Sequence, residues 1–330
     1  MNSIKNKKVL VTGADGFIGS HVVEELVHNG AEVDAMVYYN SWNSHGWLGD
    51  IPKEIFSKIK IVRADVRDSG HMNQLIPNFD YVLHLASLIA IPYSYDAPLS
   101  YVETNVIGTT NILNAAKNSK KLIRLIHTST SEVYGTAQTV PITEQHPLVG
   151  QSPYSASKIA ADKMAESFAR SFNMPIVTAR PFNTYGPRQT ARAIIPTIIS
   201  QALKGSTIQL GDLTPTRDFN FAKDTARGFL KLMSAPGIEG ETFNIGSGRE
   251  ISIKDLVQLI EKILDKKIEV KQDPNRIRPE KSEVFRLLAC NKKTESKTGY
   301  KPEVTLEEGL KSTIDWIRNN LGYFSDEYAK

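Results

Sequence analysis

The chain is poor in cysteine, in net charge and in long apolar runs, and each shortage excludes a class of protein. Its single cysteine, Cys290, excludes an internal disulfide framework and favours a reducing compartment. A net charge of +4 over 330 residues gives no reason to expect nucleic acid as the main partner. No run approaches the roughly 20 apolar residues of a membrane span, and the N-terminal apolar run is too short for a signal sequence. We therefore expect a cytoplasmic protein without a nucleic-acid or membrane partner.

Metal-ligand patterns are missing as well. The seven histidines include no pair at i, i+4 that flanks an acid, and a single cysteine offers no cysteine pair. The sequence therefore predicts no metal site. Cys290 is expected to be a buried apolar residue within a strand.

Short apolar runs alternate with helix-length segments along the first 180 residues. Buried parallel strands are predicted at 9–11, 31–38, 60–62, 81–85, 122–126 and 175–179. This alternation predicts an α/β fold, a doubly wound parallel Rossmann sheet with a smaller C-terminal substrate-binding lobe. We expect residues 1–180 and about 218–248 to form the dinucleotide-binding domain, and residues 181–217 and 249–330 to form the lobe.

Three glycines, Gly13, Gly16 and Gly19, follow the first predicted strand and open the first predicted helix. Glycine permits the tight turn and lets a pyrophosphate approach the backbone, where the N-terminus of the helix offers free N–H groups. The position of the turn within a βαβ unit is the context that a dinucleotide-binding motif requires. The sequence therefore predicts a dinucleotide site here.

The G-x-x-G-x-x-G spacing resembles the extended short-chain dehydrogenase/reductase family. Asp65-Val66 after the third strand and Leu85-Ala86-Ser87 after the fourth resemble its adenine contact and its cofactor-lining segment. No acid or arginine occurs at 36–40, after the second strand, so the choice between NAD and NADP stays open. The resemblance implies a tightly bound NAD or NADP. The implied cofactor-binding residues are Gly13, Gly16, Phe17, Ile18, Gly19, Asp65, Val66, Leu85, Ala86, Ser87, Tyr154 and Lys158.

Tyr154 and Lys158 stand four residues apart and therefore share one face of a helix. A neighbouring ammonium, together with the positive nicotinamide, lowers the pKa of a phenol and makes it a base near neutral pH. The resemblance implies that the hydroxyl of Thr130 hydrogen-bonds the reacting sugar oxygen. Thr130, Ser131, Glu132, Tyr154 and Lys158 are the predicted catalytic residues.

Glu132 distinguishes between the reactions of the family. Its simple 4-epimerases usually lack an acid here, its 4,6-dehydratases carry Thr-Asp-Glu, and its UDP-glucuronate decarboxylases carry Thr-Ser-Glu, as this chain does at 130–132. In a dehydratase, Glu132 would remove the C5 proton and protonate the departing C6 hydroxyl, and Ser131 or a held water would complete the relay. The alternative is a glutamate that caps a helix or forms a buried salt bridge.

Four longer segments, at 38–47, 186–196, 214–221 and 278–284, resemble the nucleotide-diphospho-N-acetylglucosamine 4,6-dehydratases of the legionaminic-acid type. The aromatic segment at 38–47 is expected to cover the cofactor, to meet a neighbouring subunit or to pack as a simple loop. Because arginine can clamp a diphosphate, Arg217 is expected at the nucleotide and Arg278 at the diphosphate, and Asn183 matches a phosphate contact. Arg188, Arg192 and Arg276 are further substrate-binding candidates.

We therefore expect a nucleotide-sugar 4,6-dehydratase, a lyase that recycles its NAD(P) internally. UDP-N-acetylglucosamine is the preferred substrate, and a GDP-linked form is close behind. The alternatives are a UDP-glucuronate decarboxylase, then a nucleotide-sugar 4-epimerase and, outside enzymes, a non-catalytic NAD(P)-binding regulator. The resemblance also implies a homodimer that associates through helices near 100–117 and 153–172.

Overall fold

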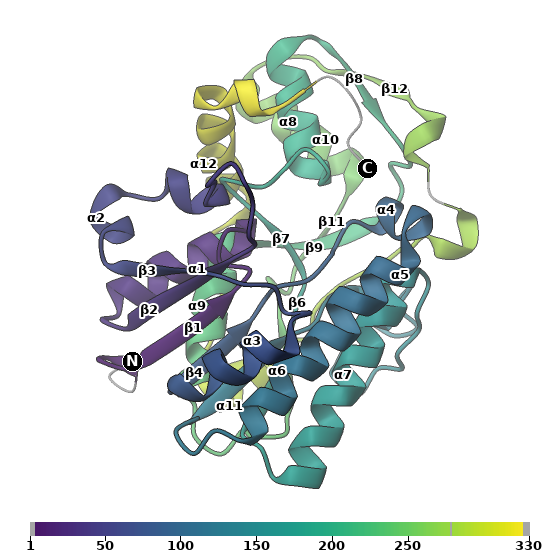
Figure 1. Cartoon of the computed structure of the whole chain (residues 1–330). Coiled ribbons are helices and arrows are strands. Elements are labelled where there is room, and N and C mark those ends of the chain that lie inside the picture. The colour runs from purple at the N-terminus through teal and green to yellow at the C-terminus, as the bar shows by residue number, and fades with distance from the viewer. Residues whose placement is uncertain (1–3, 278, 326–330) are drawn as a thin grey trace.

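The computed structural model describes residues 4–277 and 279–325, and within them a seven-stranded parallel sheet forms the centre of the larger lobe (Figure 1). In space the strands follow the order β3-β2-β1-β4-β5-β6-β10, and each neighbouring pair is parallel. The predicted doubly wound Rossmann sheet is confirmed. The strands are β1 (Lys8–Thr12), β2 (Glu32–Val37), β3 (Ile59–Arg63), β4 (Tyr81–His84), β5 (Arg124–Thr128), β6 (Ile176–Pro181) and β10 (Thr242–Ile245).

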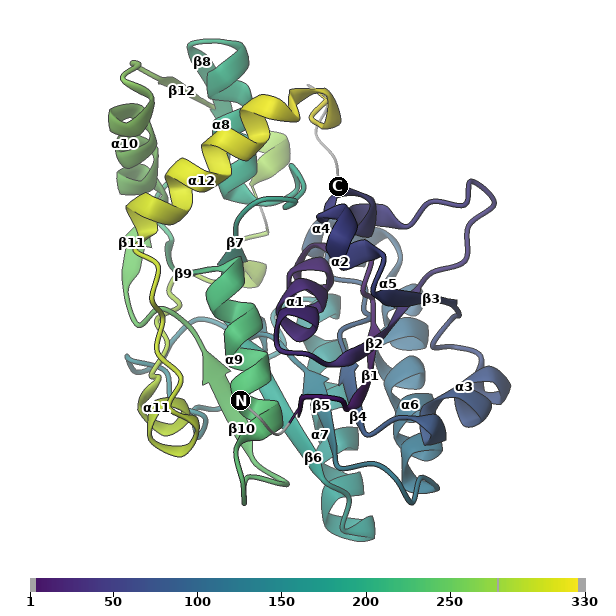
Figure 2. The ribbon, with the colours of Figure 1, turned by 90° about the vertical axis from the view of Figure 1, so that its left-hand side faces the viewer.

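Helices cover both faces of this sheet, which explains why its central strands carry apolar residues on both sides. α1 (Phe17–His28) and α9 (Ala222–Ser234) pack together on one face. On the other face lie α3 (Ser69–Leu75), α6 (Gly108–Lys117) and α7 (Pro153–Phe172), and Figure 2 shows the sheet between the two layers.

The second lobe has its own small sheets and its own core. Strands β7 (Asn183–Tyr185), β9 (Thr216–Phe221) and β11 (Glu250–Ser252) form one sheet, and β8 (Thr207–Leu210) and β12 (Glu269–Gln272) form another. The helices α8 (Ile194–Lys204), α10 (Ile253–Leu264) and α12 (Leu306–Asn319) enclose an apolar core with them. Since β9 pairs with β7 and β11, the chain returns to the main sheet at α9.

Short elements complete the described chain. The remaining helices are α2 (Lys53–Phe56), α4 (Ile91–Asp96), α5 (Pro98–Tyr101) and α11 (Lys292–Thr298), and a π-helix runs over Val102–Ile107. The 3-10 turns are Gly46–Asp50, Ile76–Asn78, Ser131–Tyr134, Pro274–Arg276, Glu280–Ser282 and Leu321–Tyr323. The prediction for Cys290 is wrong, because this residue is only half-buried and lies just outside an isolated bridge at Ala289, in no strand.

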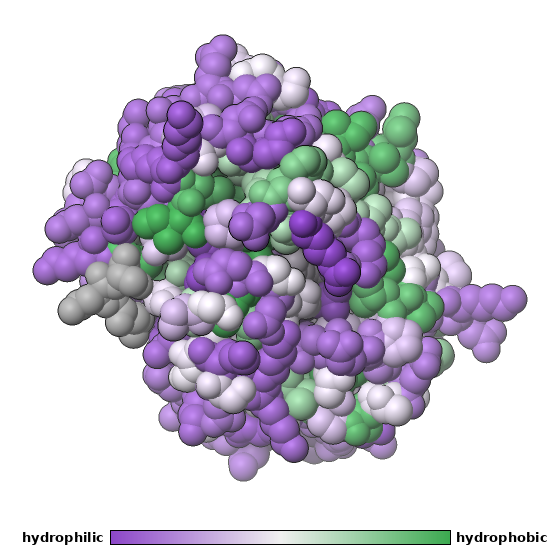
Figure 3. Space-filling view, turned by 90° about the horizontal axis from the view of Figure 1, so that it is seen from below, coloured by the Kyte–Doolittle hydropathy of each residue, from purple (hydrophilic) through white to green (hydrophobic). Residues whose placement is uncertain are grey.

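The surface is hydrophilic over most of the face in Figure 3, and hydrophobic side chains gather along one edge of it. That edge lies on the side where α4, α5 and α7 appear in Figure 1. Exposed apolar residues of this region include Tyr93, Leu99 and Ile107. None of the helices in the described ranges is long and apolar enough to cross a membrane.

Candidate active site

A cavity of about 680 Å³ lies between the carboxyl edge of the main sheet and the second lobe. This is the edge at which open α/β folds bind ligands, because the strand-to-helix loops converge there. Most of the residues singled out in the sequence line the cavity. These are Gly13, Gly16, Phe17, Ile18, Gly19, Leu85, Ala86, Ser87, Thr130, Ser131, Glu132, Tyr154, Asn183, Arg192 and Arg217.

The glycine turn fits a dinucleotide. Gly13 has φ +67° and lies against β4, where a Cβ would meet the Ala86 nitrogen at 2.8 Å. Gly16 is the N-cap of α1 and adds no side-chain cap, and the first turn of the helix carries no acid. The N–H groups at this end of the helix are thus left to an anion such as a pyrophosphate.

Asp65 and Val66 do not line the cavity. The Asp65 carboxylate accepts hydrogen bonds from the guanidinium of Arg67, and the hydrogen bonds from this side chain lower the pKa of Asp65. The side chain of Val66 is 4% exposed and belongs to the apolar core, where it limits the space beside Gly108. Their contact with adenine therefore stays a prediction.

The aromatic segment at 38–47 folds back onto the glycine turn. Trp47 N–H donates to the Asp15 carbonyl at 3.0 Å, and the Trp47 ring lines the cavity. The same ring meets Trp316 and Tyr323 of the second lobe edge-on, with centroids 5.5 Å and 5.4 Å away. Of the three expected positions for this segment, the structure places it over the predicted dinucleotide turn. The sequence carried no signal for its partners in the other lobe.

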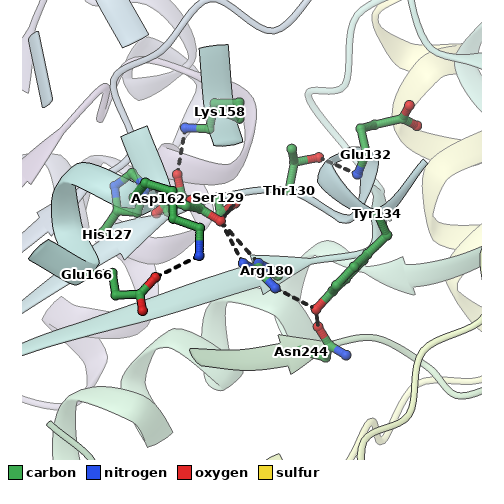
Figure 4. Close-up of polar contacts among 12 residues, drawn as sticks. His127, Ser129, Thr130, Glu132, Tyr134, Lys158, Asp162, Glu166, Arg180 and Asn244 are labelled. Atoms are coloured by element: carbon green, nitrogen blue, oxygen red, sulfur yellow. Dashed lines mark hydrogen bonds and ion pairs between the residues drawn. The ribbon is translucent and has the colours of Figure 1, made fainter. Parts of the chain in front are cut away.

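The segment after β5 carries the polar groups of the cavity floor. Thr130 is the N-cap of the 3-10 turn Ser131–Tyr134, and its hydroxyl accepts a hydrogen bond from the Glu132 N–H at 3.2 Å. Gly135, with φ +63°, ends this turn. The cap directs the Glu132 side chain away from the buried groups under β5, as Figure 4 shows.

The Glu132 carboxylate has no hydrogen bond or ion pair with any residue in the described ranges. Its side chain lines the cavity and is 9% exposed. The alternative interpretation, a helix cap or a buried salt bridge, finds no partner among these residues. A carboxylate held at the wall of a cavity without a partner is suited to proton transfer.

Helix α7 packs against the segment after β5 that forms the cavity floor, and it carries Tyr154 and Lys158. Its N-terminus is fixed by Pro153 and by a capping box between Ser152 and Ser155, so Tyr154 falls in the first turn. Lys158 does not line the cavity. It is 4% exposed, and its Nζ donates to the Thr128 carbonyl at 2.7 Å, while burial lowers the pKa of Lys158 to about 8.

The expected lowering of the Tyr154 pKa by Lys158 together with the nicotinamide stays a prediction, and in the protein alone the direction is upward. Burial raises the pKa of the Tyr154 phenol well above its usual value, a hydrogen bond with Thr130 opposes this, and the Glu132 charge adds to the rise. The ammonium of Lys158 donates its hydrogen bond to the Thr128 carbonyl. A positive charge that binds next to the phenol is therefore needed to make it a base near neutral pH.

The second lobe supplies the arginines. Arg217 lies in β9 and not in the expected loop, and its Nη2 donates to the Glu283 carboxylate at 3.0 Å. Asn183 opens β7, and its Oδ1 is buried without a partner among the described residues. Arg192 and Arg276 line the cavity. Arg278 lies outside the described residues.

Arg188 has a structural role in place of the expected contact with substrate. It lies away from the cavity wall, has φ +70° and donates to His21 Nδ1 at 2.8 Å and to Glu24 of α1. His21 Nε2 in turn donates to the Pro187 carbonyl at 2.9 Å. Burial and the Arg188 charge lower the pKa of His21 to about 3, so the imidazole stays neutral and links α1 to the loop after β7.

Sequence reasoning missed several residues of the site. Asp15, Gln189 and Glu283 line the cavity, and the buried Asp162 lies beneath it. Asp162 had a signal in the sequence, because it stands eight residues after Tyr154 on the same helix face. The described residues contain no group of acids, histidines and cysteine that could hold a metal ion.

The chain is similar to known proteins along most of its length. The family model described as GDP-mannose 4,6 dehydratase matches residues 10–313. A dTDP-glucose 4,6-dehydratase of Xanthomonas campestris is 32% identical and the match covers 94% of this chain and 93% of that protein.

Solved structures are similar along nearly the whole chain. A UDP-glucuronic acid 4-epimerase from Bacillus cereus, in complex with UDP-glucuronic acid and NAD, has a TM-score of 0.86 at 31% identity, over 95% of this chain and 99% of that one. A dTDP-glucose 4,6-dehydratase from Streptomyces venezuelae, with NAD bound, has a TM-score of 0.85 at 29% identity, over 96% and 99%. The chain belongs to the GDP-mannose 4,6 dehydratase family, within the nucleotide-sugar dehydratases and epimerases of the extended short-chain dehydrogenase/reductases.

Proposed function

We propose that this protein is a nucleotide-sugar 4,6-dehydratase that acts on a nucleotide-diphospho-N-acetylhexosamine. UDP-N-acetylglucosamine is the preferred substrate, followed by a GDP-linked form. One observation carries the proposal: the Glu132 carboxylate lines the cavity beside Thr130 and Tyr154 without a partner among the described residues. Elimination of water needs an acid and base at this position, whereas 4-epimerisation does not.

The proposed reaction begins at C4 of the sugar. Tyr154 removes the O4 proton, and Thr130 holds that oxygen. A nicotinamide cofactor held at the glycine turn and at the wall of Leu85, Ala86 and Ser87 would supply the hydride-transfer chemistry between C4 and C6. The 4-ketone acidifies the C5–H, and Glu132 removes this proton and passes it to the C6 hydroxyl, which leaves as water. Hydride at C6 and a solvent proton at C5 complete a 4-keto-6-deoxy sugar with no net redox change.

NAD is the proposed cofactor. The glycine turn, the uncapped start of α1 and the cavity wall of Leu85, Ala86 and Ser87 fit a dinucleotide. Both solved structures named above hold NAD. Because the reaction regenerates the cofactor, a tightly bound NAD suffices for repeated turnover.

The substrate is proposed to extend from the floor to the second lobe. Asn183, Arg192 and Arg217 line that part of the cavity, and Arg278 is proposed to reach the diphosphate. We further propose a dinucleotide-binding domain and a substrate-binding lobe with the expected division, the chain rejoining the first at α9. Homodimer formation through the exposed apolar residues of α5 and the following π-helix is proposed as well, with Leu99 66% and Ile107 48% exposed.

A UDP-glucuronate decarboxylase is the second candidate. The sequence Thr130-Ser131-Glu132 favours it, since a serine replaces the aspartic acid usual in dehydratases. The likeness to an epimerase that binds UDP-glucuronic acid points to the same class of substrate. Both reactions share the first oxidation and differ in whether water or CO₂ leaves.

Product analysis tests the proposal. Incubation of the full chain with UDP-N-acetylglucosamine is expected to give a product lighter by one water, with the alkali-induced absorbance of a 4-keto sugar. In deuterated solvent the product is expected to carry deuterium at C5. Release of CO₂ from UDP-glucuronate, without dehydration of the amino sugar, would establish the second candidate.

A Glu132→Gln variant tests the proposed base. It is expected to retain NAD binding and the first oxidation but to lose elimination, because the amide cannot accept the C5 proton. Full turnover of this variant would remove Glu132 from the mechanism.

A further inference from the structure

Three polar residues of α7 meet three consecutive residues at the end of β5, the first of which, Thr128, is the last residue of the strand. Lys158 donates to the Thr128 carbonyl at 2.7 Å and Asp162 accepts from the Ser129 hydroxyl at 2.8 Å, while the Thr130 side chain acts on Tyr154 by lowering the pKa of its phenol. The α7 residues are spaced by four, so they form one stripe along the helix. The stripe therefore lies along the segment 128–130. The contact made by Asp162 is the one that no step of the proposed reaction uses.

The Asp162 carboxylate uses both of its oxygens in full burial. The side chain is 4% exposed. Oδ2 accepts from Ser129 and, in a fork, from Arg180 Nε at 3.1 Å and Nη2 at 2.9 Å. Oδ1 accepts from His127 Nε2 at 3.0 Å, and Figure 4 shows these groups gathered around Asp162. Such a saturated carboxylate is rigid, because each contact restricts the others.

The network continues from Asp162 into the strands beside it. Arg180 of β6 donates to the Tyr134 hydroxyl at 3.0 Å, and that hydroxyl donates to Asn244 Oδ1 of β10 at 2.7 Å. Tyr134 ends the 3-10 turn that carries Glu132. Asp162 thus connects α7 and β5 with the frame that supports both ends of the catalytic segment.

We propose that Asp162 is a positioning residue for the reaction: through Ser129 it fixes the Thr128 carbonyl and the Thr130 hydroxyl, the groups on which Lys158 and Tyr154 depend. The inference rests on the proposed function of Tyr154 as the base. A carboxylate that only neutralises Arg180 would be expected to stabilise the fold without affecting the geometry of the phenol.

The charge of Asp162 also affects the pKa values of Tyr154 and Lys158. The groups that face the Tyr154–Lys158 pair are His84 of β4, His127 of β5, Glu132, Tyr101 of α5 and Asp162, and the Arg180 charge lies behind Asp162. Burial lowers the pKa of Lys158 to about 8, and the Asp162 charge opposes this. Burial raises the pKa of Tyr154, and Asp162 adds to that rise. Neutralising Asp162 is therefore expected to lower both pKa values.

Asp162→Asn tests the inference, with Asp224→Asn as the matched control. Asp224 is also fully buried and ion-paired, to Arg227, but it holds the backbone at 303–304 and lies off the cavity wall. Both variants lose a buried charge and are expected to be destabilised. Only Asp162→Asn is expected to lower kcat, by about 10- to 100-fold, with KM and NAD affinity within about twofold of the parent. Both limbs of its pH profile are expected to move to lower pH.

Two further variants separate position from charge and from folding. Asp162→Glu retains the charge and displaces the oxygens, so it is expected to restore the pH limbs but not the rate. Ser129→Ala leaves the ion pair with Arg180 intact, so it is expected to fold normally and to lower kcat about tenfold. Parent-like kcat in both Asp162→Asn and Ser129→Ala, or the same loss in Asp224→Asn, would refute the positioning role.

A substrate-free measurement keeps this test independent of the proposed function. The phenolate of Tyr154 is titrated in the NAD-bound protein as the absorbance difference from Tyr154→Phe. Asp162→Asn is expected to move this titration to lower pH, whichever sugar the enzyme uses. If the titration moves but the parent protein does not oxidise UDP-N-acetylglucosamine, the substrate assignment fails and the inference stands. An unmoved titration together with parent-like kinetics overturns the inference.

Discussion

The floor and the roof of the cavity are built differently. The floor, here Thr130, Glu132 and Tyr154 with Lys158 behind them, comes from two neighbouring segments, and each of these residues is at most 9% exposed. The roof, here Arg192, Arg217 and Arg276, comes from three separate segments; Arg192 is exposed, whereas Arg217 is 7% exposed and pairs with Glu283. Proton transfer needs groups fixed to a fraction of an ångström, which burial and backbone contacts provide. Recognition of a diphosphate needs arginine side chains whose guanidinium groups can pair with its oxygens.

The largest effect is expected from a substitution in the cavity floor. Tyr154→Phe removes the phenolic oxygen that takes the O4 proton, so kcat is expected to fall about 1,000-fold or more in a turnover assay. Tyr101→Phe is the matched control, because that buried ring lies 6.2 Å from Tyr154 and its hydroxyl donates to the Ala90 carbonyl. It is expected to change kcat by less than about threefold. Equal losses in both variants would show that packing, and not the base, had been disturbed.

The next effect concerns the roof. Arg217→Ala is expected to raise KM for the nucleotide sugar by about 10- to 100-fold with little change in kcat, since it removes a binding charge far from the proton transfers. Arg286→Ala serves as the control, because Arg286 belongs to the same lobe but pairs with Glu250 at a half-exposed site. Steady-state kinetics of both variants make the measurement. A fall in kcat with an unchanged KM would show that Arg217 acts in catalysis and not in substrate binding.

A third prediction addresses the link between the two regions. His21 has a folded-state pKa of about 3, below its unfolded value near 6.5, so the unfolded chain binds a proton that the folded chain does not. The free energy of unfolding is therefore expected to fall as pH drops below 6.5, by about 1.4 kcal/mol per pH unit for this group. Denaturant titrations at several pH values measure it. His21→Gln is expected to flatten this slope by about one proton, and an unchanged slope would contradict the neutral state assigned to His21.

The smallest effect concerns the aromatic contact between the lobes. Trp47→Leu removes two edge-on contacts, with Trp316 and Tyr323, and is expected to lower the unfolding free energy by about 1–2 kcal/mol. Trp42→Leu is the control, because that ring is 90% exposed. Thermal unfolding is expected to show a Tm lower by a few degrees, about 2–6 °C, for the first variant alone. Equal Tm values would mean that the lobes are held by the remaining interface.

The floor was largely predictable from sequence because its residues are close along the chain. Tyr154 and Lys158 share a helix face by spacing alone, and the glycine turn is recognised from the strand and helix around it. The direction of the Tyr154 pKa was not predictable. It depends first on how deeply the phenol is buried, and burial does not follow from a spacing of four.

The positions of the arginines near the roof could not be predicted from the sequence. Arg188 and Arg217 both stood in segments that resemble substrate loops, yet Arg188 is directed to α1 and Arg217 lies in β9. The partners of both arginines are more than 60 residues away, in Glu24 and Glu283. Asp162 is similar, because its role appears only when β5 and β6 bring Ser129 and Arg180 to it.

The sequence by itself determined the sheet, the dinucleotide turn and the Tyr154–Lys158 pair, since these rest on local periodicity and on short spacing. Only the tertiary structure decided which arginines face the cavity, that Glu132 lacks a partner among the described residues and that Asp162 supports the segment beneath the phenol. The physical reason is that burial and long-range hydrogen bonds set the protonation and direction of a side chain. Both arise when distant strands and helices pack, and no local pattern records them.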